Sequence, residues 1–146
     1  MHRRWIVALA LSLALPAAQA RHFDAVDPDV PPESMLAGQW TAVSAQLGGQ
    51  DDPVSGFADG SLRLGKSEFD FNGDHGRYTI VYAGTPGRMD IQIDRGPHAD
   101  KTIPAIYRLA GDDLTVSYQL GPGVRPKDFT SPAGSKVLVV RYHRGQ

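Results

Sequence analysis

Alternation of apolar and polar residues is the feature that most constrains how this chain can fold. The stretch MDIQID at residues 89–94 alternates strictly, and the same period of two recurs between residues 39 and 143. Successive side chains of a β-strand point to opposite faces, so this period indicates strands with one apolar and one polar face. After residue 36, no segment keeps a helical period for more than about one turn. The sequence therefore predicts an all-β fold.

Turn residues divide the alternating region into eight short strands. The predicted strands are 39–47, 61–64, 68–71, 77–82, 89–94, 102–109, 114–120 and 136–143. Short turns are predicted at Gly65-Lys66, at Asn72-Gly73 and at Gly111-Asp112. Longer loops rich in Gly, Pro or Asp are predicted at 48–60 and 121–134. Pro104 lacks a backbone donor and indicates a strand end or a bulge in the sixth strand.

Short strands in succession, without crossover helices between them, predict an antiparallel meander. An eight-stranded sheet can hide its apolar face by curling shut, which also removes both of its edges. The outward residues are charged or polar, which is the reverse of the pattern on a barrel that spans a membrane. We therefore expect an eight-stranded antiparallel up-and-down barrel that does not insert into a membrane.

The first 20 residues read as a secretory signal peptide. Arg3 and Arg4 precede an apolar run at 5–15, and Ala18-Gln19-Ala20 is a small-x-small cleavage site. We expect a periplasmic or secreted protein with a signal peptide at 1–20 and an extended lead-in at 21–35. The barrel domain would then span residues 36–146. Pro32 is well placed to start one helical turn at 32–36.

The composition argues against a disulfide-held fold and against a nucleic-acid-binding protein. The chain has no cysteine, so packing alone must hold an exported fold together. Removing Arg3 and Arg4 from the 15 basic residues leaves 13 against 16 acidic ones, which is no basis for binding nucleic acid. We expect a monomer.

The triplet Gly38-Gln39-Trp40 at the head of the first strand resembles the G-x-W motif of lipocalin-type barrels. The resemblance implies that Trp40 plugs the closed end of the barrel. It also implies that a basic residue near the end of the last strand, Arg141 or Arg144, packs over the indole. Without the resemblance, Trp40 reads most simply as a core residue.

A wider match is similar to a family of small exported bacterial domains of unknown function, first noticed in planctomycetes. It comprises LAGQW at 36–40, AIYRL at 105–109, GDDL at 111–114, and Arg125-Pro126 followed by Phe129. The family more often has glycine where this chain has Ala105. The resemblance implies a lipocalin-like fold and supplies no reaction.

No residue pattern indicates an enzyme, a metal site or a cofactor. The chain has no G-x-S-x-G motif and no cysteine nucleophile. Asp70 to Asp74 has the spacing of a calcium loop, but His75 and Val81 stand where glycine and glutamate are required, so a turn is predicted. The histidines outside the signal peptide, three of them predicted in loops or tails, are not at metal-ligand spacings.

Tyrosine recurs on the predicted inward faces. In strand 77–82 the inward residues are Tyr78, Ile80 and Tyr82. A buried tyrosine hydroxyl needs a hydrogen-bond partner, so the inward tyrosines either fill a narrow interior or line a cavity for a polar group. Arg125, in the longest loop of the second half, either clamps an anionic ligand at the rim or pins the loop to an aspartate. The candidate ligand-binding residues are Trp40, Tyr78, Tyr107, Tyr118, Arg125 and Tyr142.

The sequence supports two hypotheses of function. In the first, the barrel binds a small apolar or amphipathic molecule in its interior, with the 48–60 loop as a lid. In the second, a packed barrel acts through its loops as an envelope interaction module or an inhibitor of a secreted enzyme. Exposure of Phe57 and Phe129 would favour the second hypothesis.

Overall fold

The computed structural model describes residues 32–57 and 60–145. The predicted signal peptide at 1–20 and most of the lead-in lie outside the described residues. One short helix, α1 (Pro32–Leu36), precedes the sheet, as its proline predicts. The strands are β1 (Gly38–Leu47), β2 (Gln50–Asp51), β3 (Ser61–Leu64), β4 (Glu68–Phe71), β5 (Asp74–Tyr82), β6 (Gly87–Arg95), β7 (Thr102–Ala110), β8 (Asp113–Gln119) and β9 (Val137–Arg144).

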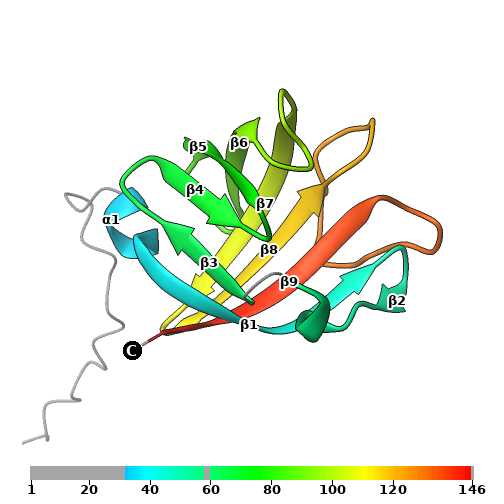
Figure 1. Ribbon diagram of the computed structural model, residues 1–146. Helices are drawn as coiled ribbons and strands as arrows, with labels where there is room; N and C mark the ends of the chain where they lie inside the picture. Colours follow the sequence, from blue (N-terminus) through cyan, green and yellow to red (C-terminus); the bar gives the residue numbers. More distant parts are fainter. Residues whose placement is uncertain (1–31, 58–59, 146) are drawn as a thin grey trace, which may run out of the picture.

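The strands close into an antiparallel up-and-down barrel (Figure 1). From β3 to β9 each strand pairs with the next, and β1 pairs with both β3 and β9. The predicted eight-stranded barrel is confirmed, with its strands β1 and β3 to β9. The additional strand, β2, is two residues long and folds back on the end of β1 within the 48–60 loop, which also holds the 3-10 turn Val54–Gly56.

Three local predictions are wrong. β5 begins at Asp74, directly after the Asn72-Gly73 turn, so His75 lies in a strand and not in a loop. Tyr82 is exposed because the β5–β6 register shifts between Ile80 and Tyr82, which turns its side chain to the outer face. Pro104 lies inside β7 and the β6–β7 register runs past it unbroken. Pro104 is tolerated because β8 begins to pair with β7 only at Ala105. Pro104 therefore has a neighbouring strand on one side only, and its missing N–H breaks no hydrogen bond on the other side.

Trp40 closes one end of the barrel. Its side chain is 0% exposed and its indole Nε1–H donates to the backbone oxygen of Leu36, 2.9 Å away at the end of α1. Figure 1 shows α1 at the end of the barrel where β1 begins and β9 finishes. The helix therefore acts as a cap whose position is fixed by the indole.

Arg144 is the basic residue that packs over this indole. Its guanidinium carbon lies 4.2 Å from the centre of the Trp40 ring. Its Nη2 donates to the oxygen of Met35 at 3.0 Å and its Nε donates to Asp112 Oδ1 at 3.2 Å. One side chain thus joins α1, the β7–β8 turn and the last strand. Arg141, the other predicted candidate, lies on the outer wall of the barrel.

Part of the outer face of three neighbouring strands is buried, which the alternating pattern does not predict. On the outer face, Ile106, Ser117 and Val139 lie directly opposite one another in β7, β8 and β9, and all three are buried. Thr115 and Ser117, predicted to face water, are buried too. Continuous burial of this kind is expected where something covers the outer face of a sheet.

The covering segment is the connection at 120–136 between β8 and β9. Arg125 fastens it: its Nη1 donates to the oxygens of Met89 (2.7 Å) and Ala105 (3.0 Å), and its Nη2 lies 2.6 Å from Asp90 Oδ1. Phe129, which is half-buried, lies under the Arg108 guanidinium at 4.7 Å. Arg125 therefore pins its loop to an aspartate, the second of the two roles predicted for it.

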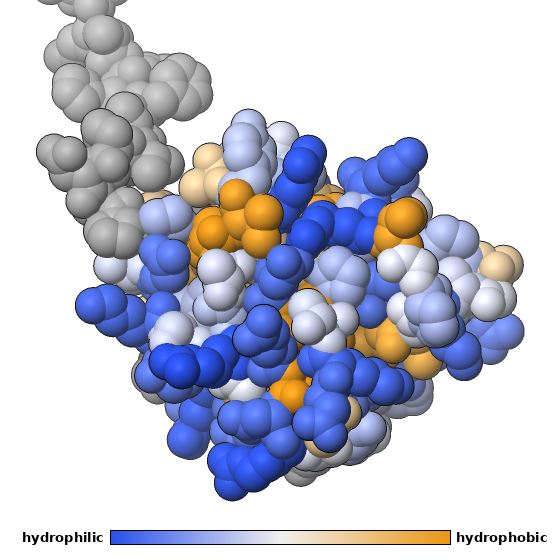
Figure 2. Space-filling model, turned by 90° about the horizontal axis from the view of Figure 1, so that it is seen from above, coloured by the Kyte–Doolittle hydropathy of each residue, from blue (hydrophilic) through white to orange (hydrophobic). Residues whose placement is uncertain are grey.

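Hydrophilic residues dominate the outside. Figure 2 shows a face that is mostly hydrophilic, with hydrophobic residues in small separate areas. The large exposed hydrophobic residues are Val43, Leu47, Val81, Tyr82 and Val124. In the part of the chain that the structure describes, no helix is long and apolar enough to cross a membrane.

Replacing Arg144 by methionine should lower the free energy of unfolding by about 1–3 kcal/mol. The change removes a cation–π contact and the charged hydrogen bonds to Met35 and Asp112, but it keeps a flexible apolar side chain over the indole. Urea denaturation followed by circular dichroism measures the loss. Arg95→Met removes an equally charged but exposed side chain and is the control. Equal losses in the two variants would contradict the capping role.

Replacing Arg125 by methionine should release the 120–136 segment while the barrel stays folded. Losing the hydrogen bonds that the charged Arg125 donates costs about 1.5–3 kcal/mol, which raises the population of the released segment at least about tenfold. Chymotrypsin should therefore cleave after Phe129 faster by about the same factor. Lys127→Met, which removes one charge from the same loop at an exposed position, should change the cleavage rate little. Cleavage that is equally slow in both variants would show that other contacts hold the loop.

Candidate ligand-binding site

Aromatic rings fill the barrel away from the Trp40 cap. Phe71 lies at the centre, with its ring 5.2 Å from that of Phe57, 6.2 Å from that of Tyr118 and 5.5 Å from that of Tyr142. Phe69 meets Tyr118 edge to face at 6.4 Å. We call these five side chains the aromatic cluster. Alternation in β4 brings Phe69 and Phe71 to the inner face, so this part of the cluster follows from the sequence pattern.

The two tyrosines of the aromatic cluster share one hydrogen bond. Their hydroxyl oxygens are 2.8 Å apart, and both side chains are fully buried. Each hydroxyl carries one proton, and a bond between the two oxygens uses only one of these protons. The other proton has no acceptor among residues 32–57 and 60–145. A buried donor of this kind is costly to leave unsatisfied, so the site favours an additional acceptor.

Phe57 comes from a loop, whereas the rest of the cluster comes from strands. It follows the 3-10 turn Val54–Gly56 in the connection between β2 and β3, and its ring is buried against Phe71. This loop joins the strands at the end of the barrel opposite α1, where β1 finishes and β3 begins. The arrangement places a loop residue over the interior at the end that Trp40 does not close.

The other predicted interior residues gather at the capped end. The Tyr78 hydroxyl donates to the oxygen of Gly65 at 2.8 Å, in the turn between β3 and β4. The Tyr107 ring lies so close to Gly87, which pairs with it, that a Cβ there would overlap the ring. Trp40, Tyr78 and Tyr107 therefore pack the capped end, while Tyr118 and Tyr142 meet in the interior. Arg125 lies on the outer wall, apart from both groups.

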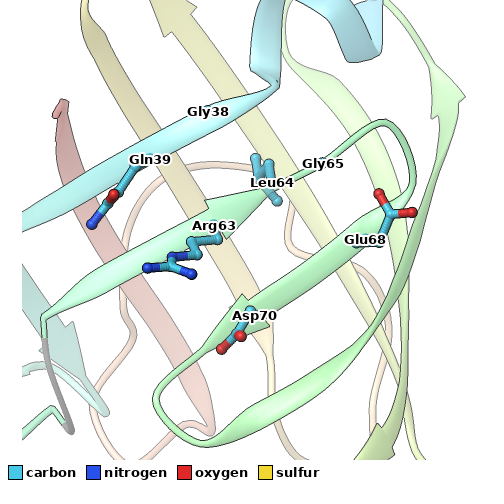
Figure 3. Close-up of a pocket in the computed structure, with 7 residues that line it drawn as sticks. All are labelled: Gly38, Gln39, Arg63, Leu64, Gly65, Glu68 and Asp70. Carbon is cyan, nitrogen blue, oxygen red and sulfur yellow. The ribbon is translucent and has the colours of Figure 1, made fainter. Parts of the chain in front are cut away.

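A separate, open groove of about 380 Å³ lies on the outer face of β1, β3 and β4 (Figure 3). Gln39, Arg63 and Asp70 stand side by side there because their strands pair in that order. Glu68 lies at the edge, where the backbone N–H of Ser67 lowers the pKa of its carboxyl group. The charges are of both signs, so the groove does not select one class of ligand.

Each described histidine has a carboxylate partner. His98 Nδ1 lies 2.6 Å from Asp74 Oδ2, and the His98 backbone N–H donates to the other oxygen of Asp74 at 2.8 Å. His75 meets Asp70, and His143 meets Asp113. The His98–Asp74 and His143–Asp113 pairs join residues far apart in sequence, so spacing alone does not reveal them, whereas His75 and Asp70 face each other across the β4–β5 turn. In the described ranges, no three His, Cys, Asp or Glu side chains converge as a metal site would require.

Burial raises the pKa of the inward tyrosines. Loss of hydration raises the pKa of Tyr118 and raises the pKa of Tyr142 well above its ordinary value, since the charged phenolate is penalised in the core. Burial, followed by the charge of Glu33, raises the pKa of Tyr78 to about 12 and also raises that of Tyr107. The interior therefore holds neutral hydroxyl groups.

These tyrosines should make the fold sensitive to alkali. Their pKa is raised in the folded state, so above pH ~10 the unfolded chain loses protons that the folded chain keeps. The free energy of unfolding should therefore fall as pH rises from ~10, by up to about 1.4 kcal/mol per pH unit for each buried tyrosine. Urea denaturation between pH 8 and pH 11 measures this slope. Tyr118→Phe should reduce the slope more than the exposed-site control Tyr82→Phe, and equal slopes would contradict the assignment.

Comparison of the chain with protein-family models, with curated proteins and with solved structures gives no match. The barrel architecture follows from the strand order and from the pairing of β1 with β9. The likeness to lipocalin-type barrels and to the family of small exported domains stays a prediction from the motifs at 36–40, 105–109 and 111–114.

Proposed function

We propose that this chain is an exported, lipocalin-like barrel that binds a small amphipathic molecule in the interior next to Tyr118 and Tyr142, and that it is not an enzyme. The observation that carries the proposal is the spare hydroxyl proton of the buried tyrosine pair. A bound carbonyl or ether oxygen would accept this proton. The aromatic rings around it would contact the apolar part of the same molecule.

The lid in this proposal is Phe57. Its ring caps Phe71 from a loop, so moving one side chain would open the interior without breaking the strand ladder. A ligand that replaces this ring recovers the apolar contact, because it buries comparable surface against Phe71. The opposite end stays closed by Trp40 and Arg144. Entry at the Phe57 end is therefore the less costly route.

The alternative, a packed barrel that acts through exposed loop aromatics, has less support. It expects Phe57 and Phe129 on the surface, whereas Phe57 is buried and Phe129 is half-buried beneath Arg108. Arg125, which this alternative also requires to be free, is engaged with Asp90. Val124, the most exposed large hydrophobic residue at 79%, stands alone in its loop.

The proposal is tested with prodan, a fluorescent naphthyl ketone whose carbonyl accepts a hydrogen bond and whose emission reports polarity. We expect saturable binding of one molecule per chain with a blue-shifted emission. Tyr118→Phe should weaken binding about 3- to 10-fold, the value of one neutral hydrogen bond. Phe57→Ala should accelerate association by removing the lid.

The matched control is Tyr78→Phe, which removes a hydroxyl whose partner is Gly65 at the capped end. It should leave prodan affinity unchanged. Native mass spectrometry of the protein isolated from its natural source complements the titration, since a retained small molecule would be observed directly. Absence of saturable binding, or equal effects of Tyr118→Phe and Tyr78→Phe, would overturn the interior site.

A further inference from the structure

A small pocket of about 210 Å³ lies on the wall of the barrel where β7, β8, β9 and β1 run side by side. It is separate from the aromatic cluster except for Tyr142, whose hydroxyl belongs to that cluster. The residues that line it are Val43, Arg108, Ala110, Asp113, Leu114, Thr115, Arg141 and Tyr142. Its volume is below the roughly 300–1,000 Å³ usual for drug-sized ligands, so it suits a small molecule or a single polar group.

Strand register places two arginines on either side of one threonine. Thr115 in β8 lies directly opposite Arg108 in β7 and directly opposite Arg141 in β9. Neighbouring strands are about 4.8 Å apart, so the two arginine Cα atoms are separated by roughly 10 Å. Arginine side chains are long enough for both guanidinium groups to reach one ligand at the centre. The Thr115 hydroxyl, which makes no hydrogen bond within the described residues, stands between them.

The charge of the pocket is not balanced by the residues around it. Within the described residues Arg141 has no carboxylate partner, and Arg108 stacks on the Phe129 ring, which leaves the edges of its guanidinium available for hydrogen bonds. Asp113 is the acidic residue of the lining, and its Oδ1 is engaged by His143 Nδ1 at 2.9 Å. Two arginines against one aspartate leave an excess of positive charge that a bound anion would neutralise.

The remaining lining is apolar. The β1–β9 register shifts between Ala42 and Ser44, and the residue between them, Val43, is 55% exposed at the pocket. Ala110 at the end of β7 adds a second small apolar side chain to the lining. A ligand held here would therefore combine a charged oxyanion with a short apolar group.

We propose that Arg108, Thr115 and Arg141 form a second binding site, on the outer wall, for the carboxylate or phosphate group of a small organic acid. Arginine binds both oxyanions through paired N–H donors, and the threonine hydroxyl supplies a further donor. The site does not depend on the interior site under "Proposed function".

The test is a titration of the ¹⁵N-labelled full chain, followed by NMR at constant ionic strength, with butanoate and inorganic phosphate as separate probes. We expect saturable shifts of the Thr115 amide and of the Arg108 and Arg141 Nε–H signals. Arg141→Gln should weaken binding about tenfold or more, because bidentate charged hydrogen bonds are lost. Arg95→Gln, which removes the same charge from an exposed arginine, should leave the affinity unchanged.

Saturation by butanoate alone identifies a carboxylate site, and saturation by phosphate alone identifies a phosphate site; either supports the proposal. Shifts that stay linear with concentration, or equal weakening by Arg141→Gln and Arg95→Gln, overturn it. Arg108→Gln provides a second variant in case Arg141→Gln does not fold, which the dispersion of the NMR spectrum reveals. Prodan binding should be unchanged in Arg141→Gln, which separates failure of this site from failure of the interior site.

Discussion

The contact between Trp40 and Arg144 is the constraint on which the rest of the barrel depends. The indole is buried and hydrogen-bonded to the end of α1, and the guanidinium that covers it also holds Met35 and Asp112. The first and last strands meet at this contact, so it fixes the register in which the sheet closes. Truncating a buried tryptophan costs about 3–5 kcal/mol, a large share of the stability of a small domain. Without disulfides, the chain has few other means to hold its first and last strands together.

The two ends of the barrel differ in how their polar groups are satisfied. At the capped end the tyrosine hydroxyl of Tyr78 and the indole N–H both find backbone oxygens. In the interior, the hydroxyl groups of Tyr118 and Tyr142 have only each other as partners among residues 32–57 and 60–145. These two donors of the capped end are therefore satisfied, whereas the buried tyrosine pair of the interior has one hydroxyl proton left over. This difference is why the binding proposal centres on the paired tyrosines and treats Trp40 and Tyr78 as structural.

Alternation and turn residues were enough to predict the closed barrel, because each strand has to bury one face and eight strands can do so together. The inward positions of Tyr118 and Tyr142 follow from the same period, but their mutual contact depends on register and on distance across the interior. The pocket at Arg108 and Arg141 was missed for a related reason. Arg108, Thr115 and Arg141 lie side by side on three strands, and residues placed together in this way share no spacing or motif along the sequence. The run VLVV at 137–140, apolar on both faces, was the available sign that something covers the outer wall.

Because β1 pairs with β9, the sheet has almost no unpaired edge. Among the described strands the one at the end of the hydrogen-bonded order is β2, which is two residues long and offers little backbone for another chain to add to. Self-association by strand addition would therefore first require the seam between β1 and β9 to open. The rate of fibril formation should then follow the frequency of that opening, so that contacts bridging the seam protect against aggregation as well as against unfolding.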